Sequence, residues 1–321
     1  MKCLVTGANG FVGAHLVRYL LDVGHEVRAV GSSEPTGTIA DERLESVRVA
    51  RSALDPAIWQ AVCRDVEVVF HLAGRAHRGN DSSSSARSIY FRDNLEMTRT
   101  LAEAALKERV RRFVFASSVT VYGTASTPGE AFREDSLAAP YSNDAYAQSK
   151  LAAEEFLLSA DIRAALEPVI VRLPLVYGTG VKGNMAALVR LACSGMPLPL
   201  SGIDNRRSFV NIPNCVDYLL TAAYHPAANG QILLVSDRED VSTPGLIRAI
   251  ARESGKTARL FSVPQRFLKT ACTLLGQEAS FEKLVGNFQV DPAVSCALLG
   301  WLPKISFVEG IARMCAKYRE A

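Results

Sequence analysis

The chain has 321 residues, and its 36 Lys and Arg against 33 Asp and Glu give a formal net charge of +3. A chain so close to neutral has no polyelectrolyte signature, so neither nucleic acid nor a membrane is expected as a partner. No apolar run reaches the roughly 18 residues that span a bilayer, and the N-terminus has no signal-peptide pattern, which makes the cytoplasm the expected location.

The first half of the chain alternates short β-branched runs with helical patterns. The predicted strands are residues 3–6, 26–30, 66–70, 112–116 and 168–172. The predicted helices begin at Phe11, Ala86 and Ala145. Near-continuous apolar strands that alternate with helices indicate an α/β fold with a doubly wound parallel sheet.

The second half is less regular. After about Val176, prolines divide the chain into shorter elements, which predicts a smaller second lobe. We expect one domain at residues 1–176 and another at 177–321, with the chain able to cross between the lobes. The serine-rich segment 75–87 is predicted to be a loop. Seven cysteines, odd in number and without a Cys-x-x-Cys pair, argue against a disulfide framework and a zinc site, so no metal is expected.

A glycine-rich turn, Gly7-Ala8-Asn9-Gly10-Phe11-Val12-Gly13, directly follows the first strand and opens the first helix. Glycines suit this position because a side chain would block both the turn and the approach of its backbone to a pyrophosphate. The free N–H groups of the following helix then bind the phosphates. The sequence therefore predicts a dinucleotide site, although simple tight-turn glycines are an alternative.

The end of the second strand bears on the choice of cofactor. A carboxylate at this position hydrogen-bonds the ribose 2′-hydroxyl of NAD and repels the 2′-phosphate of NADP. The sequence here reads Val30-Gly31-Ser32-Ser33 and contains no acid. Because Ser32 and Ser33 offer hydroxyls and no acid is present, NADP is favoured over NAD. The turn contains no arginine that would bind a 2′-phosphate, so NAD stays an alternative cofactor. Arg51 is a further candidate for contact with a 2′-phosphate.

Two polar residues in the first half of the chain, His71 and Asn94, are candidates for a catalytic role. His71 follows an apolar strand, and a packed strand histidine is the more common case. Asn94 is expected at the start of a helix, where a hydrogen bond at the helix end or to another helix is the preferred interpretation. We therefore expect both residues to be structural.

The residues with the most chemical information are Tyr146 and Lys150, which lie one helical turn apart. Shifting a tyrosine pKa from about 10 to near neutrality requires roughly 4 kcal/mol, which is the order of energy a cation about 4 Å away supplies. Ser118 follows the strand at 112–116, where it is able to hydrogen-bond a substrate oxygen or, alternatively, to cap the strand end. An exposed helix start is the alternative for the Tyr-x-x-x-Lys pair.

Taken together, these motifs resemble an extended short-chain dehydrogenase/reductase of the NAD-dependent epimerase/dehydratase family. This group includes UDP-galactose 4-epimerase and related nucleotide-sugar enzymes, and the resemblance covers essentially the whole chain. It implies a Rossmann dinucleotide-binding domain and a smaller C-terminal α/β substrate lobe. The matching segments are residues 6–13, 71–74, Asn94 with Thr98, 118–123, 146–150 and 172–178.

The resemblance assigns roles to these residues. Tyr146 would be the acid/base, Lys150 would hold the nicotinamide ribose and lower the tyrosine pKa, and Ser118 would orient the sugar oxygen. Leu173 and Pro174 would pack against the nicotinamide. The expected cofactor-binding residues are Gly7, Asn9, Gly10, Phe11, Val12, Gly13, Ser32, Leu72, Ala73, Gly74, Tyr146, Lys150, Leu173 and Pro174.

The second half contains two further matches to nucleotide-sugar enzymes. Asn184 opens a helix as family members place an asparagine against the substrate diphosphate, and Arg207 resembles the arginine of a later strand that binds it. Substrate contacts are therefore expected from Ser118, Tyr146, Asn184 and Arg207. The sequence departs from UDP-galactose 4-epimerase at Pro174-Leu175 and at Asn211, which weakens that specific assignment.

The leading hypothesis is an NADPH-dependent 4-ketoreductase of a UDP-linked N-acetylated 6-deoxyhexose in surface-polysaccharide biosynthesis. The first alternative is a UDP-hexose or UDP-N-acetylhexosamine 4-epimerase with tightly bound NAD. A protein that binds a dinucleotide as a sensor, without chemistry, is the alternative from another class. The resemblance also implies a homodimer, since this family commonly pairs through helices of the first lobe.

Overall fold

The computed structural model of the protein describes residues 1–33, 40–50, 53–76, 84–274, 276 and 278–319. Within these residues, seven parallel strands form one sheet in the order β3-β2-β1-β4-β5-β6-β9. The prediction of a doubly wound parallel sheet is thus confirmed, and the predicted strands lie within two residues of the observed ones. The strands are β1 Lys2–Thr6, β2 Glu26–Gly31, β3 Leu44–Arg48, β4 Val68–His71, β5 Arg112–Ser118, β6 Glu167–Leu173 and β9 Ile232–Leu234.

The strand order reverses at β1, which pairs with β2 on one side and with β4 on the other. The register places Thr6 beside both Val30 and His71. The turns that follow β1, β2 and β4 therefore meet at the carboxyl edge of the sheet. In open α/β sheets such a switch point is where ligands bind.

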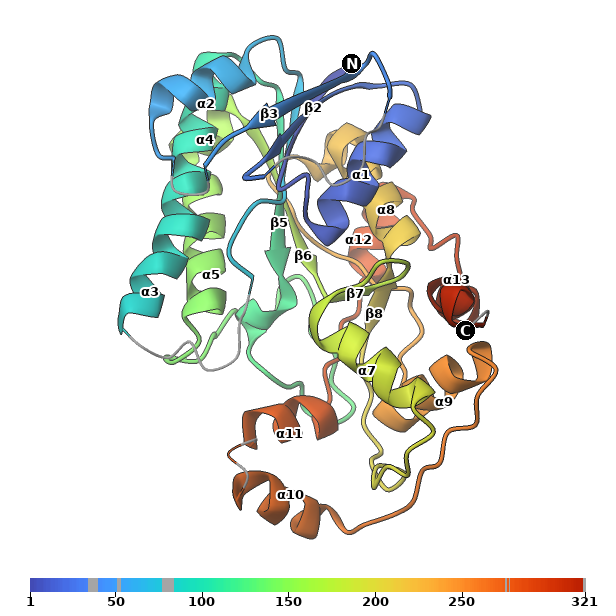
Figure 1. Ribbon diagram of the computed structural model, residues 1–321. Coiled ribbons are helices and arrows are strands. Elements are labelled where there is room, and N and C mark those ends of the chain that lie inside the picture. The colour runs from blue at the N-terminus through green and yellow to red at the C-terminus, as the bar shows by residue number, and fades with distance from the viewer. Residues whose placement is uncertain (34–39, 51–52, 77–83, 275, 277, 320–321) are drawn as a thin grey trace.

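Helices cover both faces of the sheet (Figure 1). One face packs against helices whose apolar residues share a core with β1 and β6: α1 Phe11–Asp22, α8 Ile212–Tyr224 and α12 Ala293–Leu299. The other face packs against α2 Pro56–Cys63, α4 Met97–Lys107, α5 Ala145–Leu157 and the short α6 Ala160–Ala165. Near-continuous apolar strands are required because both faces are buried.

The second lobe is built on a small parallel pair, β7 Leu175–Tyr177 and β8 Phe209–Asn211. Its core includes Tyr177, Phe209 and Ile247 and is separate from the two cores that flank the large sheet. The helices of this part are α7 Gly183–Cys193, α9 Thr243–Glu253, α10 Gln265–Leu274, α11 Glu278–Val285 and α13 Phe307–Arg319. The 3₁₀ turn η3 Pro226–Ala228 belongs to the large-sheet side, since Ala228 lies in the core shared by β1 and β6.

The chain crosses back to the large sheet after it enters the second lobe. Helix α8 packs against α1, and β9 pairs with β6 at the sheet edge. The domain boundary at residues 176 and 177 stays a prediction, but the main sheet includes residues from both sides of it. Among the described residues, no helix is both long and apolar enough to cross a bilayer.

The prediction of a loop over residues 75–87 is wrong for its last residues, because helix α3 spans Ser84–Tyr90. Residues 77–83 lie outside the described part of the chain. Helix α3 continues into η1, a π-helix over Phe91–Glu96, and then into α4. A π-helix adds a residue to a turn and is found frequently at functional sites, and this one contains the buried Asn94.

Candidate active site

The glycine turn lies between β1 and α1 and contacts the turn after β4. Gly7 has φ of 69°, and a Cβ placed on it would lie 2.7 Å from the Ala73 backbone nitrogen. A Cβ on Gly13 would overlap the Gly7 carbonyl oxygen. Both positions therefore exclude any side chain. Gly10 precedes α1 without a side-chain cap, which leaves the first N–H groups of this helix available to a phosphate.

A cavity of about 260 Å³ opens beside this turn, at the carboxyl ends of β1, β2 and β4. None of the described residues that line it carries a charge, and most are small or apolar. This cradle, with side chains excluded at the turn and helix N–H groups facing outward, fits an adenosine diphosphate moiety. Its lining residues are Thr6, Gly7, Asn9, Gly10, Val30, Gly31, Ser32, Ser33, Val49, Ala50, Trp59, Leu72, Ala73, Gly74 and Met97.

Helix α5 and strand β5 bring the three predicted catalytic residues together. Ser118 is the last residue of β5, Tyr146 lies in the first turn of α5, and Lys150 follows one turn later. The Ser118 hydroxyl hydrogen-bonds the Tyr146 phenol. It also bonds Thr120 Oγ1 at 2.9 Å and accepts from the Thr120 N–H at 3.3 Å, so Ser118 caps η2 Val119–Tyr122 as well.

Lys150 is almost fully buried, and its contacts fix the position of its ammonium group. Lys150 Nζ donates to the Ala116 carbonyl oxygen at 2.8 Å and lies 4.4 Å from the centre of the Phe115 ring. The ammonium thus points at the end of β5. Gly74 lies close by, since a Cβ on it would be 3.4 Å from Lys150 Nζ and 2.8 Å from Asn94 Oδ1.

The pKa of Tyr146 shifts in the direction opposite to the one expected from the sequence. Burial raises the pKa of the Tyr146 phenol above its ordinary value, and the hydrogen bond with Ser118 only partly offsets this rise. The predicted lowering of this pKa by Lys150 is wrong for this geometry, because the ammonium is directed to Ala116. Burial lowers the pKa of Lys150 to about 8, and the Glu154 carboxylate acts in the opposite direction. At neutral pH both side chains therefore carry their protons.

With this geometry in place, comparison with known proteins identifies the family. The family model described as "NAD dependent epimerase/dehydratase family" matches residues 3–235. The chain belongs to this family. The expected resemblance and the expected enzyme class are both confirmed, and NAD is the cofactor named for the family.

Individual known proteins are similar to this chain along most of its length. "UDP-glucose 4-epimerase" from Vibrio cholerae is 34% identical over 320 residues, which are 99% of this chain and 95% of that relative. "UDP-N-acetyl-alpha-D-glucosaminuronate decarboxylase" from Bacillus cytotoxicus is 28% identical over 273 residues, covering 82% of this chain and 83% of the relative. The solved structure "MoeE5 in complex with UDP-glucuronic acid and NAD" has a TM-score of 0.79 at 26% identity, covering 100% of this chain and 99% of that one.

The end of β2, which discriminates between cofactors, is organised by a residue of the glycine turn. Asn9 Nδ2 donates to the Ser33 carbonyl oxygen at 2.6 Å and to Ser33 Oγ at 3.1 Å. A Cβ on Gly31 would lie 2.5 Å from Asn9 Nδ2, so Asn9 occupies the space that a side chain at position 31 would need. Ser32 is exposed and lines the cavity, whereas Arg51 lies outside the described residues.

The structural roles expected for His71 and Asn94 are confirmed. His71 is fully buried between Thr6 Oγ1 at 2.7 Å and Thr98 Oγ1 at 2.9 Å, and burial lowers its pKa to about 3. Asn94 Nδ2 donates to Ser149 Oγ of α5 at 2.8 Å, and Asn94 Oδ1 accepts from the Arg75 N–H at 2.7 Å. Asn94 thereby links the chain after Gly74 to the helix that carries Tyr146.

A buried ion pair that the sequence analysis did not predict anchors α5 to the sheet. Glu154 and Arg172, which are 2% and 3% exposed, pair through Arg172 Nη2 and Glu154 Oε2 at 2.6 Å. The Ser117 hydroxyl also donates to Glu154, and the Arg172 guanidinium lies 4.6 Å from the centre of the Tyr122 ring. The sequence contained one indication of this arrangement: Glu154 lies four residues, about one helical turn, after Lys150 and therefore on the same face of the helix.

Replacing Glu154 by Gln is expected to lower the free energy of unfolding by about 3 kcal/mol, because the Arg172 charge stays buried without a counter-charge. Urea unfolding measures this change. The matched control is Glu155→Gln, an exposed position on the same helix, where we expect a change within about 0.5 kcal/mol. Equal losses in the two variants would show that the buried pair has no special importance.

Lys150→Met is expected to abolish activity and leave the protein at least as stable as the wild type at pH 7. Burial depresses the pKa of the ammonium, so the unfolded wild-type chain binds an additional proton between pH 8 and 10.5, and the stability of the wild type rises relative to that of Lys150→Met across that window. The difference between 10.5 and about 8 corresponds to about 3 kcal/mol. Thermal unfolding of both proteins from pH 7 to 10.5 measures the effect; a stability difference between wild type and Lys150→Met that does not change with pH contradicts it.

The two residues predicted to bind the substrate diphosphate, Asn184 and Arg207, lie in the second lobe. Asn184 is exposed in the first turn of α7. Arg207 is partly buried beside β8, where its Nη1 donates to the Gly286 carbonyl oxygen at 3.1 Å and burial lowers its pKa, whereas Arg206 is exposed. Leu173 ends β6, and the buried Pro174 joins it to β7. Their contacts with ligands stay predictions.

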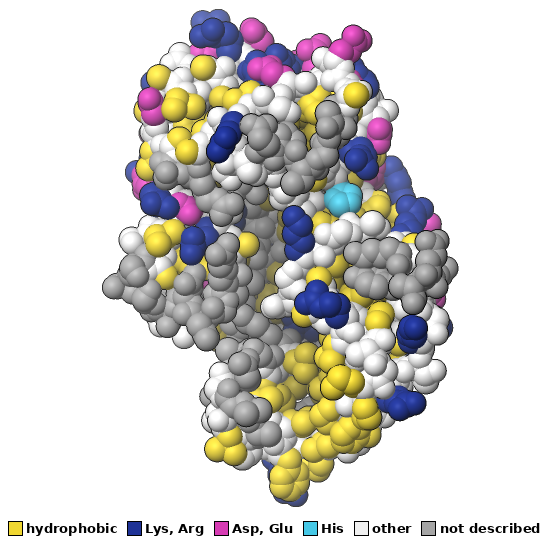
Figure 2. Space-filling model, in the orientation of Figure 1, with side chains coloured by type: hydrophobic (Ala, Val, Ile, Leu, Met, Phe, Trp, Pro, Cys, Tyr) yellow, Lys and Arg dark blue, Asp and Glu magenta, His cyan; other side chains and the backbone are white. Residues whose placement is uncertain are grey.

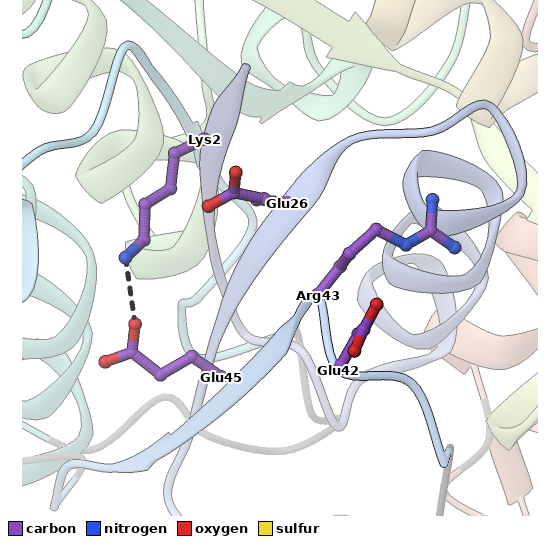
Figure 3. A pocket seen from close by; sticks show the side chains of 5 residues that line it. All are labelled: Lys2, Glu26, Glu42, Arg43 and Glu45. Carbon is purple, nitrogen blue, oxygen red and sulfur yellow. Dashed lines mark ion pairs between the residues drawn. The ribbon is translucent and has the colours of Figure 1, made fainter.

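A second surface depression lies at the opposite end of the sheet and is lined by charged side chains (Figure 3). Its residues come from the amino ends of β1 and β2 and from the start of β3. Lys2 Nζ pairs there with Glu45 at 3.2 Å, and Arg28 pairs with the same carboxylate at 2.9 Å. Ligands of such sheets bind at the carboxyl ends, so these ion pairs belong to the sheet edge and not to the active site.

Proposed function

We propose that the protein is an NAD-dependent 4-epimerase of a UDP-linked sugar. The observation that carries this proposal is the hydrogen-bonded pair of Ser118 and Tyr146 beside the glycine-turn cavity, with the buried Lys150 one turn further along α5. Support for the substrate class comes from the Vibrio cholerae relative and from MoeE5, whose descriptions name UDP-sugars. The proposal replaces the 4-ketoreductase as the leading hypothesis.

In the proposed mechanism the cofactor is held by the glycine turn, by the cavity residues and by Lys150, with Leu173 and Pro174 beside the nicotinamide. When bound, NAD would supply the reversible redox chemistry at C4 of the sugar. Tyr146, as its phenolate, would remove the proton of the C4 hydroxyl as that carbon is oxidised and give it back to the same oxygen on reduction, which requires the positive charges of Lys150 and the oxidised cofactor to offset the burial that raises its pKa. Ser118 donates a hydrogen bond to this oxygen and so stabilises its developing charge.

The sugar must turn between these two transfers so that the hydride returns to the opposite face. We propose that Arg207 and Asn184 hold the diphosphate during this turn, because a guanidinium binds phosphate oxygens in a bidentate manner. A fixed diphosphate lets the hexose rotate about its link to the phosphate without leaving the site. The identity of the hexose then depends on the second lobe.

A 4-ketoreductase remains a second candidate, and two observations favour it. The described lining of the cofactor cavity has no carboxylate at the end of β2, which removes the usual barrier to the 2′-phosphate of NADP. The raised pKa of Tyr146 also suits a residue that only donates a proton. In this case NADPH would be exchanged in every turnover.

Release of the bound nucleotide distinguishes the two candidates. The purified protein is denatured, the released nucleotide is identified by mass spectrometry, and the native protein is incubated with UDP-glucose or UDP-N-acetylglucosamine without added cofactor. We expect bound NAD and formation of the C4 epimer. Oxidation of added NADPH by a UDP-4-keto-sugar, without epimer formation, would instead establish the reductase. Light scattering tests the homodimer, which stays a prediction.

A further inference from the structure

Helix α10 exposes apolar side chains that a helix of a globular protein normally buries. Phe267 is 57% exposed and Leu274 is 82% exposed. The helix lies at one end of the second lobe, where it packs mainly against α11 (Figure 1). An amphipathic helix usually directs its apolar face to the core, so the outward orientation of this face indicates a binding surface.

The exposed apolar surface continues beyond the helix. Phe261 is 47% exposed, and Met196 is 58% exposed on a neighbouring segment. The two segments are held together by backbone hydrogen bonds, from the Leu198 N–H to Arg259 and from the Phe261 N–H to Leu198. We call Met196, Phe261, Phe267 and Leu274 the α10 surface. Figure 2 shows adjoining hydrophobic side chains at this end of the molecule, with basic side chains near them.

The charge around this surface is mainly basic, with Glu278, Glu282 and Lys283 contributed by helix α11, which packs against α10. Residues 256–277 contain four basic residues and no Asp or Glu. All four are exposed, and the Arg266 guanidinium lies 5.0 Å from the centre of the Phe267 ring. The net charge of +3 for the whole chain conceals this local concentration. The four basic residues are Lys256, Arg259, Arg266 and Lys269.

We propose that the α10 surface docks on an anionic lipid membrane. A helix with exposed aromatic and aliphatic residues on one face and Lys and Arg on the other binds in the plane of the interface, with its apolar face at the boundary between headgroups and acyl chains. Helix α10 has 10 residues and is therefore about 15 Å long, half the thickness of the hydrocarbon core, so it lies on the bilayer and does not cross it.

The charge argues against a second copy of the chain as the occupant. A symmetric interface brings the same patch of both subunits together, which would set four basic residues against four basic residues. An anionic lipid surface offers the complementary charge over the whole patch. This proposal departs from the sequence-based expectation of no membrane partner, because that expectation used the net charge of the whole chain.

Co-sedimentation of the full-length protein with vesicles tests the proposal. We expect binding to phosphatidylglycerol/phosphatidylcholine vesicles, weaker binding to phosphatidylcholine alone, and loss of binding at high salt. The double variant Phe267→Glu/Leu274→Glu should bind the anionic vesicles at least about tenfold more weakly, because both apolar anchors are lost. The control is Leu137→Glu, which adds one carboxylate where the double variant adds two, at a side chain that is 84% exposed elsewhere; it should retain binding within about twofold.

The proposal is overturned if the wild type does not sediment with anionic vesicles, or if the Leu137 variant loses binding as strongly as the double variant. Self-association of the wild type, lost in the double variant and measured by light scattering without vesicles, would assign the surface to a second copy instead. Thermal unfolding shows whether each variant is folded. The result does not depend on the proposed reaction, since no residue of the α10 surface belongs to the active site.

Discussion

A Tyr146→Phe variant is expected to turn over its sugar nucleotide about 10²- to 10⁴-fold more slowly than the wild type, while it still binds substrate and cofactor. The substitution removes only the phenolic hydroxyl, which carries the transferred proton in the proposed mechanism and bonds Ser118. The ring and its packing against Tyr90, with centroids 6.1 Å apart, remain. The loss should therefore appear in kcat, with a much smaller effect on substrate affinity.

The control for this experiment is Tyr141→Phe, which removes the same atom from a side chain that is 55% exposed ahead of α5. Its kcat should equal that of the wild type within about twofold, as expected for a surface position. Turnover is measured by nuclear magnetic resonance of the sugar anomeric protons, and affinity is measured by calorimetry. Normal turnover in Tyr146→Phe would remove the acid/base assignment and with it the proposed function.

Gly13→Ala is expected to weaken cofactor binding by at least about tenfold and to destabilise the protein by about 1–3 kcal/mol. The added Cβ overlaps the Gly7 carbonyl oxygen, and neither partner is a flexible side chain. Either α1 or the glycine turn must move. Because the turn also contacts the Ala73 backbone, its displacement alters the cavity between β1 and β4.

Ala14→Ser is the control, since it places a small change at an exposed position of the same helix. Thermal unfolding and fluorescence titration with NADH are measured for both variants. We expect Ala14→Ser to match the wild type in both. A Gly13→Ala protein with unchanged NADH affinity would contradict the close backbone approach on which the cofactor site depends.

The sheet and the glycine turn were predictable because each depends on local sequence. Apolar strands with flanking helices have a characteristic pattern, and three closely spaced glycines between a strand and a helix are typical of a dinucleotide site. Tyr146 and Lys150 were predictable from their spacing together with the resemblance. Ser118 was predicted in the same way, and it lies at the carboxyl end of β5 beside Tyr146.

Features that depend on long-range contacts were not predictable. Glu154 and Arg172 are 18 residues apart, and only the packing of α5 on β6 reveals that they form a buried pair. The contact between Asn9 and Ser33, which occupies the space beside Gly31, is of the same kind. The direction of the Tyr146 pKa shift was missed because a cation one turn away is bound by the Ala116 carbonyl, and because burial of the phenol has its own cost.

The return of the chain from the second lobe has a consequence for biosynthesis. One apolar face of the sheet is covered by helices α1 and α8. Helix α8 is synthesised about 50 residues after β6, which corresponds to a delay of roughly 3–10 s during translation. During this interval the nascent chain has an apolar surface that its own residues do not yet cover. Chaperone occupancy should be highest for nascent chains that end between β6 and α8, and a fragment truncated after residue 176 should aggregate.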